Sequence, residues 1–272
     1  MESVTVQELH VYPVKSARGI AQSQVRLAAT GFEWDRHWMI VRADGMFLTQ
    51  RTHPVLTQVV PQLAIDQLVL TAAGLSPLTL PLAPQGKGRP VRIFRDACEG
   101  LDQGDEAAAW ASQVLGEPVR IVRAPAAPAR RASPEFAGPK PAPLTFPDGF
   151  PILVCNRASL DDLNERLAEP LPMERFRPNL VLAGLPPFAE DRIASLEIGR
   201  IILTLVKPCT RCVIPSTDQR TGIRGLDPLP VLRTFRFDRE LLGVTFGENA
   251  IITRGQGESI VRGTECRITY DN

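Results

Sequence analysis

The alternation of apolar and polar positions predicts short strands through most of the first half of the chain. Several runs bounded by turn-forming residues place an apolar side chain at every second position, as half-buried strands do. The predicted strands are residues 4–14, 24–27, 37–41, 46–50, 68–71 and 78–80. Asp44-Gly45 stands between the third and fourth runs and is typical of a tight hairpin turn. Residues 104–116 predict a helix, because two acidic residues begin it and a glycine ends it.

A segment rich in proline and alanine, residues 124–147, follows these strands and predicts a connector. Beyond it, an apolar run at 150–155 precedes a helix that should begin at Ser159 and extend to about Leu167. Further strands are predicted at residues 180–182, 201–206, 250–253 and 267–270. No internal repeat is visible. The pattern therefore predicts an α+β chain that is mainly β, with a few helices, in two lobes.

Length, composition and charge limit the classes of protein to which the chain can belong. A length of 272 residues allows one large or two ordinary domains, and 44% hydrophobic with 22% charged residues is usual for a soluble globular protein. A net charge of +1 argues against binding nucleic acid through bulk charge. No apolar run reaches membrane-spanning length and no secretory signal is present, so we expect a cytoplasmic protein without a membrane partner. Five cysteines, an odd number in a chain of this length, do not resemble a disulfide framework, so we expect most of them to be reduced.

The motif with the most chemistry is Lys207-Pro208-Cys209-Thr210-Arg211-Cys212. A thiolate beside fixed cations is stabilised in its charged form and becomes a nucleophile or a metal ligand. Four interpretations remain open on these residues alone. The pair is half of a zinc site, a thioredoxin-like redox pair, two half-buried structural cysteines, or the source of one ligand to a metal held mainly by a cofactor. A zinc site needs two further ligands, whereas the remaining cysteines are isolated, at Cys98, Cys155 and Cys266.

Three other segments concentrate cations and amides. Tyr12 to Gly19 presents Lys, Ser and Arg after a strand, which suits a phosphate or another anion. The hairpin should bring Asp35-Arg36-His37-Trp38 close to Thr49-Gln50-Arg51 and form a second cationic group. Arg175-Phe176-Arg177-Pro178-Asn179 leads into a strand and could bind a heterocycle edge or a phosphate. Taken singly, each segment is also explained, and two of the three better explained, by solvated cations or by local ion pairs.

In their order along the chain, these motifs resemble the MOSC-domain proteins. The resemblance rests on Tyr-Pro-Val-Lys-Ser, Asp-Arg-His-Trp, Arg-Phe-Arg-Pro-Asn and Lys-Pro-Cys-Thr-Arg-Cys with Asp-x-x-Thr-Gly, and it covers nearly the whole chain. It is closest to the branch of the mitochondrial amidoxime-reducing component and its YcbX-like bacterial relatives. It implies a MOSC N-terminal β-barrel-like domain over residues 1–123, the connector at 124–147, and a MOSC domain over 148–272 that binds the molybdenum cofactor.

The resemblance also implies a set of site residues. Cys212 is the expected molybdenum ligand and catalytic residue, with Arg211 helping to keep it deprotonated. Cys209 is expected to shape the loop, and a tyrosine of the mitochondrial branch is replaced near Thr245. The remaining expected cofactor contacts are Lys15, Ser16, Arg36, Asp148, Gly149, Phe150, Arg177, Asn179, Thr210 and Arg211.

The implied reaction is the two-electron reduction of the N–O bond in small N-hydroxylated compounds. The cysteine spacing of plant-type ferredoxins is missing, so we expect no Fe–S cluster in this chain. Electrons should then come from a separate electron-donor protein of ferredoxin, flavin or cytochrome type. One alternative is a molybdenum cofactor or sulfur carrier protein without turnover. Another is a β-barrel binding module with structural cysteines, which would hold no metal.

Overall fold

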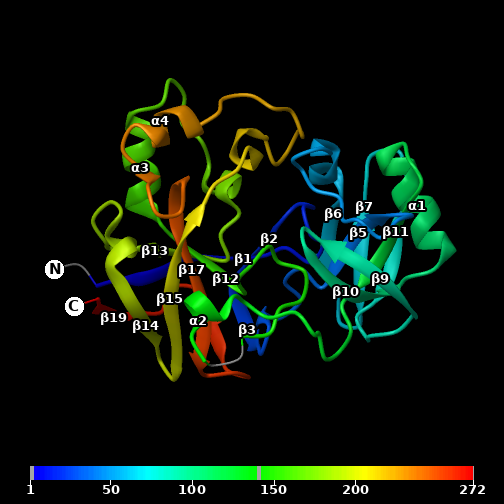
Figure 1. Ribbon diagram of the computed structural model, residues 1–272, viewed down its shortest axis with the longest axis horizontal. Helices are drawn as coiled ribbons and strands as arrows, with labels where there is room; N and C mark the ends of the chain where they lie inside the picture. Colours follow the sequence, from blue (N-terminus) through cyan, green and yellow to red (C-terminus); the bar gives the residue numbers. More distant parts are fainter. Residues whose placement is uncertain (1–2, 140–141, 272) are drawn as a thin grey trace.

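The computed structural model describes residues 3–139 and 142–271 and shows two lobes built mainly of strands (Figure 1). The predicted α+β, mainly β class is confirmed. Residues 140–141 of the predicted connector lie outside the described residues. The smaller lobe contains two sheets, in the strand orders β5-β11-β10-β9 and β6-β7-β8. Its elements are β5 (Trp38–Arg42), a 3₁₀ turn (Pro54–Gln58), β6 (Val60–Leu63), β7 (Gln67–Thr71), β8 (Leu78–Pro81), β9 (Lys87–Ile93), β10 (Asp96–Asp102), α1 (Asp105–Leu115) and β11 (Val119–Arg123).

The larger lobe contains a nine-stranded sheet in the order β19-β14-β15-β17-β12-β13-β1-β2, with β16 paired to β17, and a three-stranded sheet β18-β3-β4. The pairings of the described residues close neither sheet into a barrel. The strands are β1 (Thr5–Val11), β2 (Ile20–Gln22), β3 (Gln24–Ala28), β4 (Gly31–Phe32), β12 (Ile152–Asn156), β13 (Leu180–Ala183), β14 (Ile193–Ile198), β15 (Ile201–Thr210), β16 (Phe237–Asp238), β17 (Gly243–Arg254), β18 (Ser259–Val261) and β19 (Arg267–Tyr270). The helical elements are α2 (Pro134–Ala137), α3 (Arg157–Glu165), α4 (Leu229–Arg233) and 3₁₀ turns at Met173–Phe176, Ala189–Arg192 and Ile214–Ser216.

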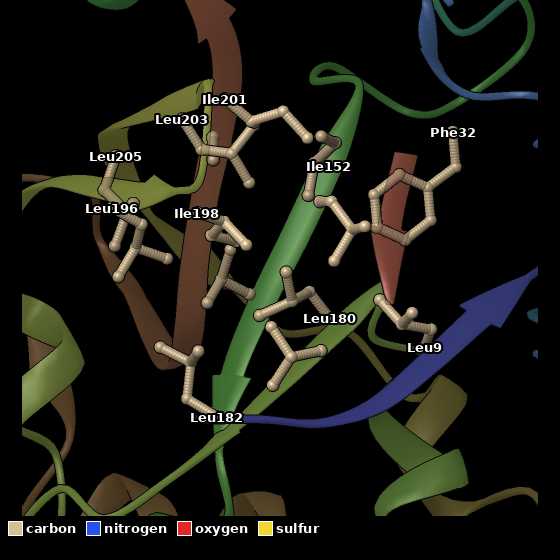
Figure 2. Close-up of a cluster of buried hydrophobic side chains, with 14 of the residues drawn as sticks. Leu9, Phe32, Ile152, Leu180, Leu182, Leu196, Ile198, Ile201, Leu203 and Leu205 are labelled. Atoms are coloured by element: carbon tan, nitrogen blue, oxygen red, sulfur yellow. The ribbon is translucent and has the colours of Figure 1, made fainter. Parts of the chain in front are cut away.

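The first strands of the chain belong to the sheets of the larger lobe. β1 pairs antiparallel with β13, and β3 pairs with β18. Figure 2 shows Leu9 and Phe32 in one buried cluster with Ile152, Leu180 and Leu182. The chain therefore leaves the larger lobe only after its first thirty or so residues, and the segment that follows β1 lies between the two lobes. The boundaries at residues 123 and 148 stay a prediction.

Local signals predicted about half of the strands and α-helices, and one predicted strand is wrong, whereas β9, β10, β11 and β14 were not predicted. α1 begins after Gly104 and ends at Gly116, whose φ of 71° is left-handed. The turn at Asp44-Gly45 is present, since the Arg42 N–H donates to the Met46 carbonyl at 2.9 Å. Residues 46–50 do not form the predicted strand and make only isolated bridges. The chain curls there instead, because the Thr49 carbonyl accepts the N–H groups of the third and fourth residues after it.

In the described part of the chain, no helix has the length and hydropathy needed to cross a lipid bilayer.

A buried carboxyl in the larger lobe predicts a dependence of stability on pH. Glu248 lies in β17 with 3% of its surface exposed, and its Oε1 atom has no partner among the described residues. Burial, reinforced by Asp191 and Glu190, raises the pKa of Glu248 to about 9 from an ordinary 4.5. Between these values the folded protein keeps a proton that the unfolded chain has released. Stability should therefore fall as pH rises through this window, by up to about 1.4 kcal/mol per pH unit.

Glu248→Gln should flatten this slope and make the protein more stable than the wild type near pH 8.5. Urea unfolding at several pH values measures both effects. Glu240→Gln changes an exposed carboxyl in the same way and serves as the control. An unchanged slope in Glu248→Gln would mean that this carboxyl is already ionised in the folded protein.

Candidate functional site

One cavity is lined by side chains from both halves of the chain, and it contains every predicted site residue. These are Lys15, Ser16, Arg36, Asp148, Gly149, Phe150, Arg177, Asn179, Thr210, Arg211 and Cys212. Five segments that are distant in sequence thus converge on one place. Their roles there remain predictions.

The two cysteines reach the cavity at the end of β15. This strand runs antiparallel to β17 and ends at Thr210, after which the Arg211 N–H donates to the Val244 carbonyl at 2.7 Å. Cys209 and Cys212 are both free thiols and both half-buried. Neither is covered as a structural cysteine in a core would be, so both sulfur atoms are available to a ligand in the cavity.

Arg211 binds the first cysteine of the motif. Its Nη1 donates to the Cys209 Sγ at 3.0 Å and its Nη2 donates to the Phe176 carbonyl at 2.7 Å. Burial alone would lower the pKa of Arg211, but the neighbouring cysteine sulfurs, Cys209 foremost, raise it. The direct partner of Arg211 is therefore Cys209, and not Cys212 as its place in the motif suggested. Adjacency in sequence did not predict this, because consecutive residues at a strand end point to different sides.

Arg51 is a further cation that lines the cavity close to Cys212, and the sequence motifs included it but did not assign it to the site. Burial would lower the pKa of Arg51, but Asp148 and Cys212 outweigh this and raise it. Arg51 also donates to an Asp148 oxygen at 3.2 Å, and its guanidinium lies 4.9 Å from the centre of the Phe94 ring. The curl after the hairpin positions Arg51 here, so no local strand pattern could have predicted it.

Asp148 joins two cations at the edge of the cavity. Lys15 is only 4% exposed, and its Nζ donates to the Phe146 carbonyl at 2.7 Å and forms an ion pair with Asp148. Burial lowers the pKa of Lys15 despite this pair. Burial acts to raise the pKa of Asp148, but Lys15 and Arg51 outweigh it and hold this pKa below its usual range. The carboxylate therefore stays ionised and fixes both cations.

A second group contains Arg36, Arg177 and Asn179. Arg36 forms an ion pair with the buried Asp35 and donates to the Asn179 Oδ1 at 3.1 Å. That Oδ1 also accepts the Leu153 N–H at 3.1 Å, so the Asn179 amide ties Arg36 to the sheet. Arg177 is buried and donates to the Gln219 Oε1 at 2.9 Å, with no carboxylate partner among the described residues. Burial lowers the pKa of Arg177 to about 10.

Three of these residues have left-handed backbone, with φ of 67° at Ser16, 52° at Arg36 and 56° at Arg177. Such conformations cost roughly 1–3 kcal/mol each in residues other than glycine, and they cluster at binding and catalytic sites. All three line one cavity. Strain of this kind indicates that the surrounding contacts hold these three side chains in a required direction.

Two other residues singled out in the sequence do not act in the cavity. Asp218 accepts the N–H groups of Arg220 and Thr221 at 2.8 and 2.9 Å and pairs with Arg175, so it organises its own loop. Thr245 hydrogen-bonds to Arg236 and is not among the lining residues. Asn249, on β17, also lines the cavity. The sequence did not predict this, because Asn249 belongs to none of the recognised motifs.

The chemistry of the lining fits an anionic ligand that carries a soft metal. Five cationic side chains face one carboxylate, and the buried Arg211 Nε has no partner among the described residues. No cluster of three or more His, Cys, Asp or Glu side chains in residues 3–139 and 142–271 is arranged to hold a metal. A metal here would have one or two protein sulfur ligands and would need the rest from its own cofactor, and thiolates suit soft metals. The donor set thus fits the molybdenum cofactor that the resemblance implies.

Comparison with known proteins gives matches over both halves. The chain matches the family description "MOSC N-terminal beta barrel domain" over residues 3–118 and "MOSC domain" over residues 141–267. It is 34% identical to "Mitochondrial amidoxime reducing component 2" of Bos taurus, over 85% of this chain and 72% of that protein. Identity to the human "Mitochondrial amidoxime-reducing component 1" is 31%, over 91% and 78%. The "Molybdenum cofactor sulfurase" of Danio rerio is 32% identical, over 89% of this chain and 32% of that protein.

Proposed function

The chain belongs to the MOSC family, and on this premise we propose that it is an oxidoreductase that binds the molybdenum cofactor in the cavity and reduces N-hydroxylated compounds. The observation that carries the proposal is the convergence of the free Cys212 thiol with five cationic side chains in one cavity. The similarity to amidoxime-reducing components over most of both chains supports the substrate class.

Each part of the cavity has a distinct task in this proposal. Cys212 is the protein ligand to the metal, and Arg51 lies beside its sulfur to offset the negative charge of a bound thiolate. Arg36, Arg177 and Lys15 bind the anionic groups of the cofactor, and the backbone of residues 148–150 closes one side. When bound, the cofactor supplies the two-electron chemistry, and these residues hold and orient it.

The overall reaction consumes two electrons and two protons for each N–O bond and releases water and the reduced nitrogen compound. The electrons come from a separate donor protein of ferredoxin, flavin or cytochrome type in this proposal. A cytoplasmic location also stays a prediction, since the amidoxime-reducing relatives are named as mitochondrial.

Metal analysis tests the proposal directly. Protein purified from a host that makes molybdopterin should contain close to one molybdenum atom and one pterin per chain, and protein from a host without this pathway should contain neither. Mass spectrometry of the metal and fluorescence of the oxidised pterin measure the two contents. Absence of molybdenum from protein made with the cofactor available would rule out both the reductase and a cofactor carrier.

A carrier protein is the second candidate, and the similarity to a molybdenum cofactor sulfurase favours it. A cofactor or sulfur carrier would bind molybdenum or persulfide sulfur and pass it on without turnover. An assay with an N-hydroxylated substrate and an artificial electron donor separates the two. Molybdenum-loaded protein that does not turn over would point to the carrier.

A further inference from the structure

Two arginines of the cavity lie against one buried tyrosine ring. The guanidinium carbon of Arg36 is 4.3 Å from the centre of the Tyr12 ring, and that of Arg177 is 4.2 Å from it. Both distances are within the range of a cation–π contact, and Tyr12 itself is only 2% exposed. One aromatic side chain thus contacts two cations that come from segments about 140 residues apart.

The Tyr12 ring is held in place from several sides. Its backbone N–H donates to the Asp35 Oδ1 at 2.9 Å, and its hydroxyl donates to the Pro178 carbonyl at 3.1 Å. A Cβ atom added at Gly19 would lie 2.4 Å from the ring, so the chain passes this edge with no room for a side chain. The ring therefore cannot shift without moving both arginine segments, because Asp35 and Pro178 are their immediate neighbours in sequence.

The two cations are not neutralised equally. Arg36 has the Asp35 carboxylate, whereas Arg177 has the neutral Gln219 amide and no carboxylate among the described residues. Two like charges on one ring repel each other, and the electron-rich face of the ring offsets only part of this repulsion. An anion in the cavity that both guanidinium groups can reach would supply the missing charge.

We propose that Tyr12 is a positioning residue, whose aromatic face fixes Arg36 and Arg177 so that both present N–H groups to one anionic group of the ligand. The face of the ring performs this role, and the hydroxyl contributes only its bond to Pro178. If the proposed function holds, the anionic group belongs to the molybdenum cofactor. Nothing in the sequence motif separates Tyr12 from an ordinary core residue, because its place before Pro13 is equally that of a buried strand end.

The test compares substitutions that keep or remove the ring. Tyr12→Phe keeps the face, whereas Tyr12→Leu and Tyr12→Met fill similar space without it. Val6→Ala is the matched control, because it weakens β1, the strand that leads to Tyr12, at a fully buried position away from the cavity. Circular dichroism and thermal unfolding identify any variant that fails to fold. If either Tyr12→Leu or Tyr12→Met fails to fold, the other serves as the variant without the ring.

Molybdenum and pterin content of the purified proteins is the first measurement. We expect Tyr12→Phe to stay within about twofold of the wild type and Tyr12→Leu and Tyr12→Met to retain about tenfold less cofactor. Val6→Ala should lose thermal stability and keep its cofactor. Full retention in both apolar variants would overturn the proposal. A loss in Tyr12→Phe would overturn it too, because the hydroxyl would then carry the effect.

Binding of pyrophosphate to cofactor-free protein is the second measurement, and it does not depend on the proposed function. Calorimetry at low salt should show affinity about tenfold weaker in Tyr12→Leu and within about twofold in Tyr12→Phe. Equal affinities in the wild type and both apolar variants would overturn the proposal. If the wild type contains no molybdenum but pyrophosphate binding follows the aromatic ring, the reductase fails while the positioning role of Tyr12 stands.

Discussion

Replacing Cys212 with alanine is expected to abolish both molybdenum retention and reductase activity while the fold stays intact. Cys212 lies half-buried after the end of β15 and belongs to none of the core clusters of the described residues. Its substitution should therefore change the free energy of unfolding by no more than about 0.5 kcal/mol. The loss of function follows because Cys212 is the proposed ligand to the metal, and the other thiol that lines the cavity, Cys209, accepts a hydrogen bond from the Arg211 Nη1. Metal content, turnover with an artificial donor and urea unfolding measure the three quantities.

Cys209→Ala is the matched control in the same loop. It removes the sulfur that accepts from the Arg211 Nη1, so the Arg211 side chain loses one of its two hydrogen bonds. We expect lower activity but a molybdenum content near that of the wild type, because only one thiolate is needed as a ligand. Full activity in a folded Cys212→Ala variant would disprove the assignment of the ligand. Equal loss of metal in both variants would indicate that the two sulfurs act together.

The membership of the cavity could be predicted from sequence mainly through the resemblance of the motifs, in their order, to one family, and each contributing segment also combines a polar side chain with a nearby turn. Lys15 and Ser16 follow a strand, Arg177 precedes one, and Cys212 follows one, so each lies where the backbone leaves a sheet. Loops beside a rigid scaffold commonly carry functional residues. Their order along the chain then matched one family, and this was enough to assemble residues that are far apart in sequence.

The partners within the cavity could not be predicted, because they depend on geometry between distant segments. Arg211 contacts Cys209 although its neighbour in sequence is Cys212, and Arg51 comes close to Cys212 from a curl that the local periodicity predicted as a strand. The pairing of β1 with β13 likewise joins residues about 175 positions apart. Register between distant strands is set by the burial of whole faces, which no local window of sequence contains.

Gly247 is the second position at which a small change should have a large effect. It lies in β17 and has φ of 75°. On either side of it, Thr245 pairs with Thr210 and Glu248 pairs with Pro208, so β17 has one more residue between these pairs than β15 has. This extra residue is a β-bulge, and it sets the register at which the end of β15 reaches the cavity. Gly247→Ala should reduce the free energy of unfolding by about 3–5 kcal/mol and lower the midpoint of thermal unfolding by roughly 10 °C.

Two separate causes make up this expected loss, and a second glycine distinguishes them. A Cβ atom at Gly247 would lie 2.6 Å from the Cys155 Sγ and 2.7 Å from the Val154 carbonyl oxygen, in addition to the left-handed backbone. Gly199 has φ of 59° but no atom within 4 Å of such a Cβ, so Gly199→Ala should cost only about 1 kcal/mol. Urea unfolding measures the loss of unfolding free energy in each variant. The loss in Gly247→Ala minus the loss in Gly199→Ala gives the contribution of the steric contacts alone. Equal losses would mean that the core around Cys155 yields to the added methyl group, and molybdenum content in Gly247→Ala would then stay near the wild-type value. A larger loss with falling molybdenum content would link the bulge to the position of the cysteine loop.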